Sequence, residues 1–291
     1  MCADARACSA IAFGALFLRG MPRSSSICRR QWPELARTLR ERRPFLSGLV
    51  DTLRDAGQWQ AALILDEPRL LAKAESLFER GEFFSIFDEA YPSRWLSVLR
   101  SGAPPAVWVC GAPPAATYVA IVGSRRLSEP EERFGEQSAV SAVRSGLSVV
   151  SGGAFGADAA AERAALAEGG AVLRVLPHGV GSAKGHEALA NLSVCAPWEE
   201  FSTQNAMERN TLIYAAADRS LVLKCRLKEG GSWHGAVDAL RRRSSNVFVR
   251  DDGSAPSRAL ASLGANLVSR PEQFLETPIE TGFTRALFDL G

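Results

Sequence analysis

The sequence lacks the short motifs that mark several common kinds of site. Its 291 residues include six cysteines and three histidines, with no Cys-x-x-Cys or His-Glu-x-x-His spacing for a metal or redox centre. The phosphate-binding loop Gly-x-x-x-x-Gly-Lys-[Ser/Thr] of ATP-hydrolysing proteins is absent, and so is the Gly-x-Ser-x-Gly turn that presents a serine nucleophile. The sequence therefore predicts no metal, no cofactor and no catalytic residues.

Long hydrophobic runs are also missing. The apolar stretch over residues 7–18 is shorter than the roughly 20 residues that a helix needs to cross a bilayer, so no membrane partner is expected. Residues 1–30 predict a tail, for which a targeting segment and a true start at Met21 both remain open. The scattered cysteines fit free thiols in a reducing compartment, which predicts a cytoplasmic protein.

The bulk composition permits a packed core but does not by itself indicate a partner. Hydrophobic residues make up 46% of the chain and charged residues 23%, while the net charge is only +2. The charge is uneven along the chain, however. Residues 19–43 hold eight arginines against two glutamates, and residues 209–250 hold nine Lys or Arg against three acidic residues. Such clusters suit phosphate binding, although a solvated basic surface would give the same pattern.

Three regions follow from the pattern of apolar residues. After the tail, residues 31–80 predict a helical region, and residues 81–291 predict an α/β domain. Strands rich in Val, Ile and Leu alternate with helix-length segments from about residue 116, which indicates a mostly parallel sheet covered on both faces. Strands are expected at 118–122, 147–150, 171–176, 220–225, 246–249 and 265–268, and helices at 130–144, 158–168, 205–217, 233–243 and 257–263.

Two of these strands end in glycine-containing loops that open a helix. The first loop begins Gly123-Ser124-Arg125, and the second is the segment 151–158, Ser-Gly-Gly-Ala-Phe-Gly-Ala-Asp. Glycines let the backbone approach a ligand closely, and the free N–H groups at a helix start favour anions. Phosphates of a nucleotide or a nucleic acid are the expected ligands, and Asp158 is expected to cap the helix that follows.

Further candidate residues follow later strands. The segment 230–235 predicts a third glycine loop at the same sheet edge, and Arg209 with Asn210 either points into the cleft there or clamps a helix to a loop. The proposed anion site therefore comprises Gly123, Ser124, Arg125, Ser151, Gly152, Gly153, Gly156, Arg209, Asn210, Gly231 and Ser232.

Taken in order, these segments resemble the DNA-processing protein A (DprA/Smf) family over about residues 70–250. Five segments match that family's motifs: Ala120–Arg125 (Ile-Val-Gly-Ser-Arg), Ser151–Asp158 (Ser-Gly-x-Ala-x-Gly-x-Asp), Arg209-Asn210, Gly231-Ser232 and the strand Asn246–Val249. The positions that depart from the family pattern include Phe155 and Thr211, which stand in place of arginines, and Glu162, which stands in place of a histidine. The chain is thus similar to a divergent member of the family.

The resemblance implies an extended Rossmann-like fold that binds single-stranded DNA. Members load a RecA-type recombinase during natural transformation, usually as homodimers, and are not established enzymes. The implied DNA contacts are Arg125, Ser151, Gly152, Gly153, Arg209 and Asn210. Two alternatives remain open, a Rossmann protein that senses nucleotides and a nucleotide phosphoribohydrolase. The segment 230–235 lacks the glutamate of the hydrolase signature, which disfavours the second alternative.

Overall fold

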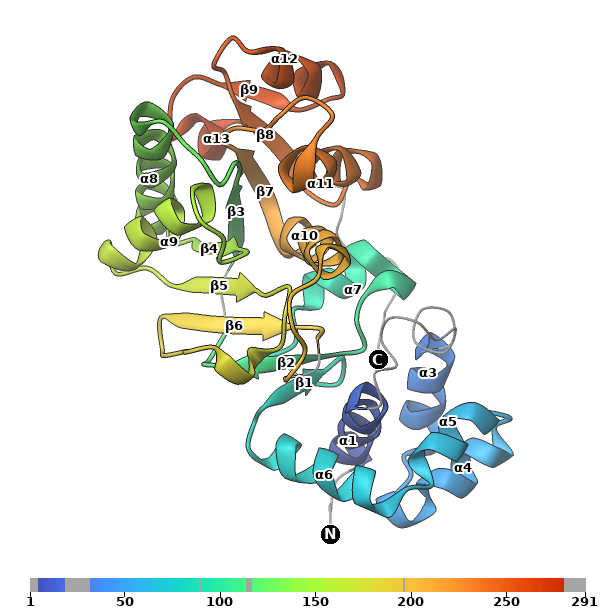
Figure 1. Cartoon of the computed structure of the whole chain (residues 1–291). Coiled ribbons are helices and arrows are strands. Elements are labelled where there is room, and N and C mark those ends of the chain that lie inside the picture. The colour runs from blue at the N-terminus through green and yellow to red at the C-terminus, as the bar shows by residue number, and fades with distance from the viewer. Residues whose placement is uncertain (1–4, 19–31, 89, 114–116, 196, 280–291) are drawn as a thin grey trace.

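The computed structural model describes residues 5–18, 32–88, 90–113, 117–195 and 197–279 of the chain (Figure 1). One nine-stranded sheet forms its centre, in the order β1-β2-β6-β5-β4-β3-β7-β8-β9. The strands are β1 Phe83–Ser85, β2 Ala106–Cys110, β3 Tyr118–Val122, β4 Ser148–Ser151, β5 Val172–Val175, β6 Leu189–Ser193, β7 Ala217–Val222, β8 Asn246–Arg250 and β9 Asn266–Val268.

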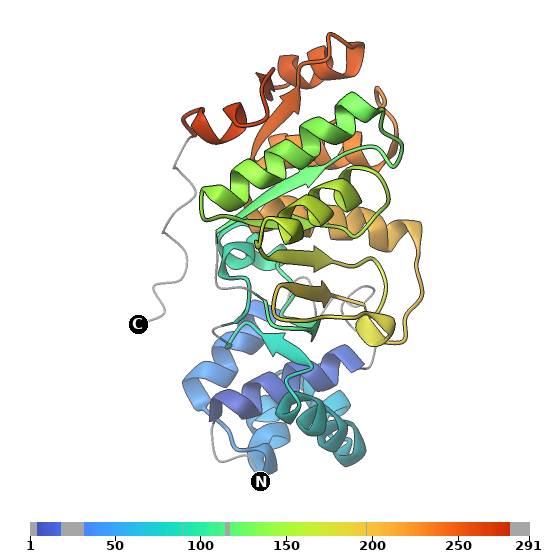
Figure 2. The ribbon, with the colours of Figure 1, turned by 90° about the vertical axis from the view of Figure 1, so that its left-hand side faces the viewer.

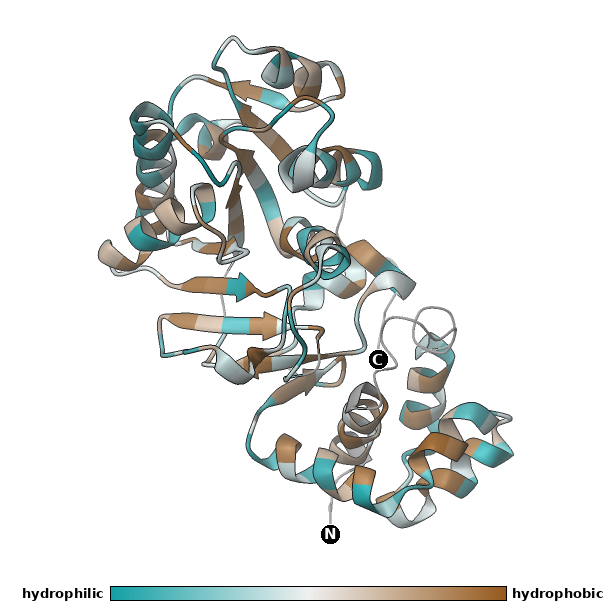
Figure 3. Cartoon of the chain, viewed as in Figure 1, coloured by the Kyte–Doolittle hydropathy of each residue, from teal (hydrophilic) through white to brown (hydrophobic). Residues whose placement is uncertain are grey.

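The pairing of the strands confirms the predicted fold class. All neighbours from β6 to β9 are parallel, and β1 and β2 add an antiparallel edge. In β3 the side chains alternate between two cores: Val119 and Ile121 belong to one, and Ala120 and Val122 to the other. Figure 3 shows how strongly hydrophobic residues dominate β3 and β8. A strand buried on both faces requires helices on both sides of the sheet.

Helices indeed cover both faces of the sheet. On one face lie α8 (Glu129–Arg144), α9 (Ala157–Ala167) and the short α13 (Gln273–Glu276), which share a core with β3 and β8. On the other face lie α10 (Thr203–Ala216), α11 (Gly230–Arg242) and α12 (Ala255–Ser262). Figure 1 separates the two layers, and Figure 2 shows α8 and α9 in front of the strands.

A helical region packs against the antiparallel edge. It consists of α1 (Ala5–Leu18), α3 (Trp32–Arg42), α4 (Leu49–Asp55), α5 (Trp59–Leu65) and α6 (Pro68–Glu79). Its buried side chains belong to the same cluster as the α10 face of the sheet. Helix α7 (Ser93–Leu99), which lies between β1 and β2 in the chain, packs against α10. Two contacts fix α7 there: Trp95 donates its indole N–H to the Leu212 carbonyl at 2.8 Å, and Arg94 pairs with Asp218 at 2.9 Å.

Residues 5–18 correct the expectation of an N-terminal tail over residues 1–30. They form α1, in which Ile11, Phe13 and Leu16 are almost fully buried. A Cβ atom at Gly14 would lie 2.4 Å from the ring of Phe83, so the small residue allows the helix to lie close against β1. A helix that is apolar on all sides is stable in water only when it is enclosed in a core. Residues 1–4 and 19–30 of the predicted tail lie outside the described ranges.

Three elements differ from the sequence-based expectation. Strand β6 is not predicted, because Asn191 and Ser193 interrupt its apolar pattern; both are buried and bond to the Lys184 and His178 carbonyls at 3.1 and 2.7 Å. Strand β7 begins at residue 217 rather than 220. Helix α11 begins at Gly230, so the predicted third glycine loop is the first turn of a helix.

The described part of the chain holds no helix with the length and hydrophobicity that a membrane crossing requires.

Candidate functional site

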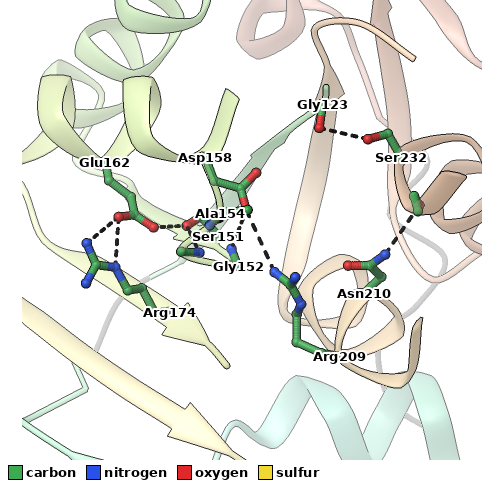
Figure 4. Close-up of polar contacts among 12 residues, drawn as sticks. Gly123, Ser151, Gly152, Ala154, Asp158, Glu162, Arg174, Arg209, Asn210 and Ser232 are labelled. Carbon is green, nitrogen blue, oxygen red and sulfur yellow. Dashed lines mark hydrogen bonds and ion pairs between the residues drawn. The ribbon is translucent and has the colours of Figure 1, made fainter. Parts of the chain in front are cut away.

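A pocket of about 820 Å³ opens at the carboxyl ends of β3 and β7, beside α10 and the start of α11. Its lining includes Gly123, Ser124, Arg125, Arg126, Ala154, Asp158, Arg209, Asn210, Lys224, Arg226, Gly230, Gly231 and Ser232. The pocket therefore brings together all three segments that the sequence places at one sheet edge. Figure 4 shows the polar contacts among them.

The loop after β3 is tied directly to the other two segments. Ala157 donates its N–H to the Ser124 carbonyl at 3.1 Å, and the Ser232 hydroxyl donates to the Gly123 carbonyl at 2.8 Å. At Gly156 the backbone has a φ of +80°, and a Cβ would lie 2.4 Å from the Ser124 carbonyl oxygen. Only glycine fits such a position without strain. The exposed Arg125 follows Ser124 in this loop and lines the pocket.

The loop after β4 uses its N–H groups internally, which corrects the expectation that they are free for an outside anion. The N–H groups of Gly152 and Ala154 donate to Asp158 Oδ2 at 3.0 and 3.3 Å, and that of Gly153 donates to Ser151 Oγ at 3.2 Å. Asp158 is also not the helix cap, because α9 begins at Ala157 and Asp158 lies inside its first turn. The carboxylate of Asp158 therefore occupies the cradle that an anion was expected to fill.

Arg209 of α10 lies against the loop after β4 and faces that carboxylate. Its Nη1 lies 3.7 Å from Asp158 Oδ2, and its side chain is 8% exposed. Its Nε has no hydrogen-bond partner among the described residues. Burial lowers the pKa of Arg209, although Asp158 opposes the shift, and burial raises the pKa of Asp158 to about 6. Both charged groups are thus poorly solvated, and the guanidinium retains unused hydrogen-bonding capacity.

Asn210 and the first turn of α11 form the remaining wall. Asn210 donates its amide N–H to the Gly231 carbonyl at 3.3 Å, so the clamp that the sequence left open is present, and Asn210 also lines the pocket. Glu229, which precedes α11, makes no side-chain hydrogen bond to the helix start. The N–H groups at the start of a helix attract anions when no side chain caps them. Gly230, Gly231 and Ser232 bring this turn to the pocket.

The pocket carries more positive than negative charge. Five basic side chains line it against two acidic ones, Asp158 and Glu229. Lys224 pairs with Glu131 at 2.9 Å, and Arg226 pairs with Glu229 at 3.1 Å. Within the described ranges, Arg125 and Arg126 take part in no ion pair. These two guanidinium groups can therefore meet an anion without first breaking a contact inside the protein.

Four predicted site residues do not line the pocket: Ser151, Gly152, Gly153 and Gly156. Ser151 is fully buried and donates its hydroxyl to Glu162, and Glu162 accepts from Arg174 Nη2 at 2.5 Å. Gly152 makes room for Arg209. These residues shape the wall of the pocket and hold Asp158 in place.

Several residues that line the pocket were not predicted from the sequence. Lys224 was not singled out because the predicted strand ran to residue 225, and Arg226 was counted only within the basic cluster of residues 209–250. Strand β7 ends at Val222, and both side chains follow it in a loop. Tyr214 also lines the pocket, and its buried hydroxyl has no partner among the described residues. Within the same ranges, no group of three or more His, Cys, Asp or Glu side chains is placed to hold a metal ion.

The fold and the pocket together define a doubly wound α/β protein with a positively charged pocket at the carboxyl edge of its parallel strands. Residues 82–278 match the sequence profile of the family described as DNA recombination-mediator protein A, and the chain belongs to this family. It is similar to the putative DNA processing protein DprA of Mycobacterium tuberculosis, with 31% identity over 170 residues. That match covers 54% of this chain and 44% of the relative, so it spans less than half of the relative's length.

Two solved structures share the fold. DNA processing protein A from Streptococcus pneumoniae superposes with a TM-score of 0.65 at 21% identity, covering 89% of this chain and 96% of that one. The Helicobacter pylori protein, whose structure was described for its single-stranded DNA binding mode, superposes with a TM-score of 0.55 at 20% identity, covering 67% and 94%. These matches agree with the observed arrangement of the sheet and its helices.

Proposed function

We propose that this protein binds single-stranded DNA through the pocket at the carboxyl ends of β3 and β7. The main observation behind the proposal is the pair Arg125 and Arg126. Both are exposed, both line the pocket, and neither forms an ion pair with a described residue. Guanidinium groups bind phosphate oxygens in a bidentate manner, which suits a phosphodiester backbone. Family membership supports the same ligand, and so does the likeness to the Helicobacter pylori protein, which binds single-stranded DNA.

In this proposal the backbone phosphates approach from the mouth of the pocket. Arg125 makes the first contact, and the uncapped start of α11 offers N–H groups to the same or the next phosphate. Arg209 lies deeper and exchanges part of its contact with Asp158 for a contact with the strand. Binding of this kind releases counterions from the nucleic acid, so the affinity falls as the salt concentration rises.

We further propose that the bound strand is handed to a RecA-type recombinase during DNA uptake or recombination, and that the protein acts as a homodimer. The family description, a recombination mediator, supports this role. Such a role places the protein in the cytoplasm, where its DNA and the recombinase are found. No catalytic step is part of the proposal, because binding and transfer of a strand need none.

Fluorescence anisotropy with labelled oligo-dT tests the proposed DNA binding. We expect tight binding at 50 mM salt, weaker binding at 200 mM, and a loss of affinity in Arg125→Ala with the salt slope reduced by about one. Arg241→Ala is the matched control, since Arg241 is an exposed arginine at the opposite end of α11. Equal affinities of the wild type, Arg125→Ala and Arg241→Ala would contradict the proposal.

Two further assays separate the alternatives. Tight binding of a mononucleotide with no affinity for oligo-dT would favour nucleotide sensing, and release of free base from a nucleoside monophosphate would favour the hydrolase. The mediator role is tested by recombinase-driven strand exchange on single strands that are coated with a single-strand-binding protein. We expect the wild type to accelerate strand exchange and Arg125→Ala to leave its rate unchanged. Analytical ultracentrifugation of the full chain tests whether the protein is a dimer.

A further inference from the structure

Large apolar side chains stand exposed around the cationic pocket. Phe201 and Met207 line it, with 54% and 47% of their surface exposed. Phe155, which is 83% exposed, lies in the loop between Ala154, a lining residue, and Gly156. We call Phe155, Phe201 and Met207 the apolar rim. They come from three places in the fold: the loop after β4, the segment before α10, and α10 itself.

The position of Phe155 is fixed by the backbone on either side of it. Gly156 packs against the Ser124 carbonyl and the backbone of Arg125, and Ala154 is held by its bond to Asp158. The backbone of Phe155 is therefore held beside the loop that carries Arg125, next to the pocket-lining Ala154. An aromatic ring that is exposed to water does not contribute to the hydrophobic core, so its burial does not stabilise the fold. Exposed apolar side chains gathered at one site commonly mark a contact surface.

We propose that the apolar rim contacts the bases of the bound strand, with Phe155 and Phe201 as stacking surfaces and Met207 as an apolar neighbour. This inference rests on the proposed single-stranded DNA binding. A single strand presents a phosphate and a planar aromatic base in every nucleotide, and its bases are free to stack on protein side chains. The pocket offers the matching pair, cations for the phosphates and aromatic rings at its rim for the bases.

The charge of the pocket decides between nucleic acid and other apolar ligands. Gly156 packs on the backbone of Ser124 and Arg125, and Arg126 follows directly, so a ligand on Phe155 also comes near two guanidinium groups. A neutral hydrophobic partner would leave these cations desolvated without a counter-charge, which is unfavourable. An acidic peptide would satisfy the cations, but it carries no regular series of aromatic faces for the two phenylalanines.

Two probes of equal length and equal phosphate number separate base contacts from backbone contacts: oligo-dT and its abasic analogue. For Phe155→Ala we expect the affinity for oligo-dT to fall roughly fivefold to a hundredfold. The affinity for the abasic strand and the salt slope are expected to stay unchanged. Trp59→Ala is the control, because Trp59 is another largely exposed aromatic residue, on α5 in the helical region.

A Phe155→Trp variant provides a direct spectroscopic readout. Stacking of a base on the indole is expected to quench its fluorescence when oligo-dT is added, whereas the abasic strand leaves it unchanged. A merely structural role of residue 155 would produce no quenching that depends on bases.

Three results would overturn the inference. If the wild type bound both probes equally well and Phe155→Ala had the wild-type affinity, the protein would bind the backbone without contacting the bases. Equal losses on both probes in Phe155→Ala would assign the residue a structural role. Binding of poly-Glu as tight as that of oligo-dT, weakened in Phe155→Ala, would assign the rim to an acidic protein partner. A wild type that binds neither strand would instead refute the proposed function itself.

Discussion

The guanidinium of Arg209 fills the space that a Cβ atom would take at Gly152, with Nη1 only 1.1 Å from that position. A cation from α10 is thereby brought against the loop after β4, where it faces the carboxylate of Asp158. The glycine is thus required by a side chain from another element and not by its own backbone angles. Gly152, Arg209 and Asp158 form one unit at the wall of the pocket.

Gly152→Ala tests this unit. The added methyl group must displace the guanidinium from Asp158, which leaves a buried carboxylate without its counter-charge and lowers stability by about 3 kcal/mol. Urea unfolding measures the change, and oligo-dT affinity should fall as Arg209 moves. Gly48→Ala is the control, since a Cβ there meets no atom within 4 Å, and it is expected to change stability by less than about 0.5 kcal/mol. Equal midpoints for both variants would contradict the described packing.

Asp158→Asn is expected to change how stability depends on pH. Burial raises the pKa of Asp158 to about 6, from 3.8 for an unperturbed carboxyl. The folded state thus holds the proton more tightly, so this group contributes stability at low pH that is lost as the pH rises from about 4 to 6. The contribution amounts to about 3 kcal/mol.

Asparagine keeps an oxygen that can accept from the Gly152 and Ala154 N–H groups but does not titrate. Urea unfolding at pH 4, 5 and 7 compares the two proteins. Between pH 4 and 6 the stability of the wild type should fall relative to that of the variant. The pKa of Asp252 is lowered and gives an opposite slope, but it is common to both proteins and cancels in the difference. A constant difference across this range would contradict the raised pKa.

The same variant should bind single-stranded DNA more tightly at pH 7. Asp158 lines the pocket and competes with a phosphate for Arg209. Loss of its charge is expected to raise the affinity for oligo-dT roughly threefold to tenfold at moderate salt. Anisotropy at pH 7 measures the change, and Asp238→Asn, a half-buried carboxylate of α11 that does not line the pocket, is the control. Weaker binding in Asp158→Asn would show that the carboxylate supports the bound ligand.

Glu162→Gln should affect stability without affecting DNA. Glu162 is buried, accepts from Arg174 and Ser151, and does not line the pocket. Loss of its charge leaves Arg174 beside a neutral partner, which costs roughly 1 to 3 kcal/mol. Urea unfolding measures this loss, while anisotropy should give the wild-type affinity. A rise in affinity as large as that expected for Asp158→Asn would mean that Glu162 faces the bound strand.

Much of the fold could be predicted because its strands are buried on both faces. Apolar residues such as those of β3 mark a strand without knowledge of its neighbours, and the glycine loops mark the ends of β3 and β4. Strand β6 was not predicted because Asn191 and Ser193 make it look polar. Both side chains donate hydrogen bonds to carbonyls outside the strand, which the local sequence pattern does not reveal. Residues 5–18 were misinterpreted because their burial depends on β1 and α6.

Part of the candidate site could likewise be predicted from the sequence, and part could not. Arg125 and Arg209 were identifiable as cations beside glycine loops, and the pocket brings both together. That Asp158 would occupy the N–H groups of the loop after β4 was not foreseeable, because it depends on α9 beginning one residue before Asp158. Likewise, the interpretation of Phe155 as a lost arginine considered charge alone, whereas the structure shows an exposed ring in the segment that contributes Ala154 and Asp158 to the cationic pocket.

Hydrogen–deuterium exchange of the full chain, with and without oligo-dT, tests most directly whether the strand binds at this pocket. We expect DNA to slow exchange in segments 123–126 and 230–235 and to leave the helices of residues 49–79 unchanged. Protection confined to those helices, or to any surface away from the ends of β3 and β7, would contradict the account.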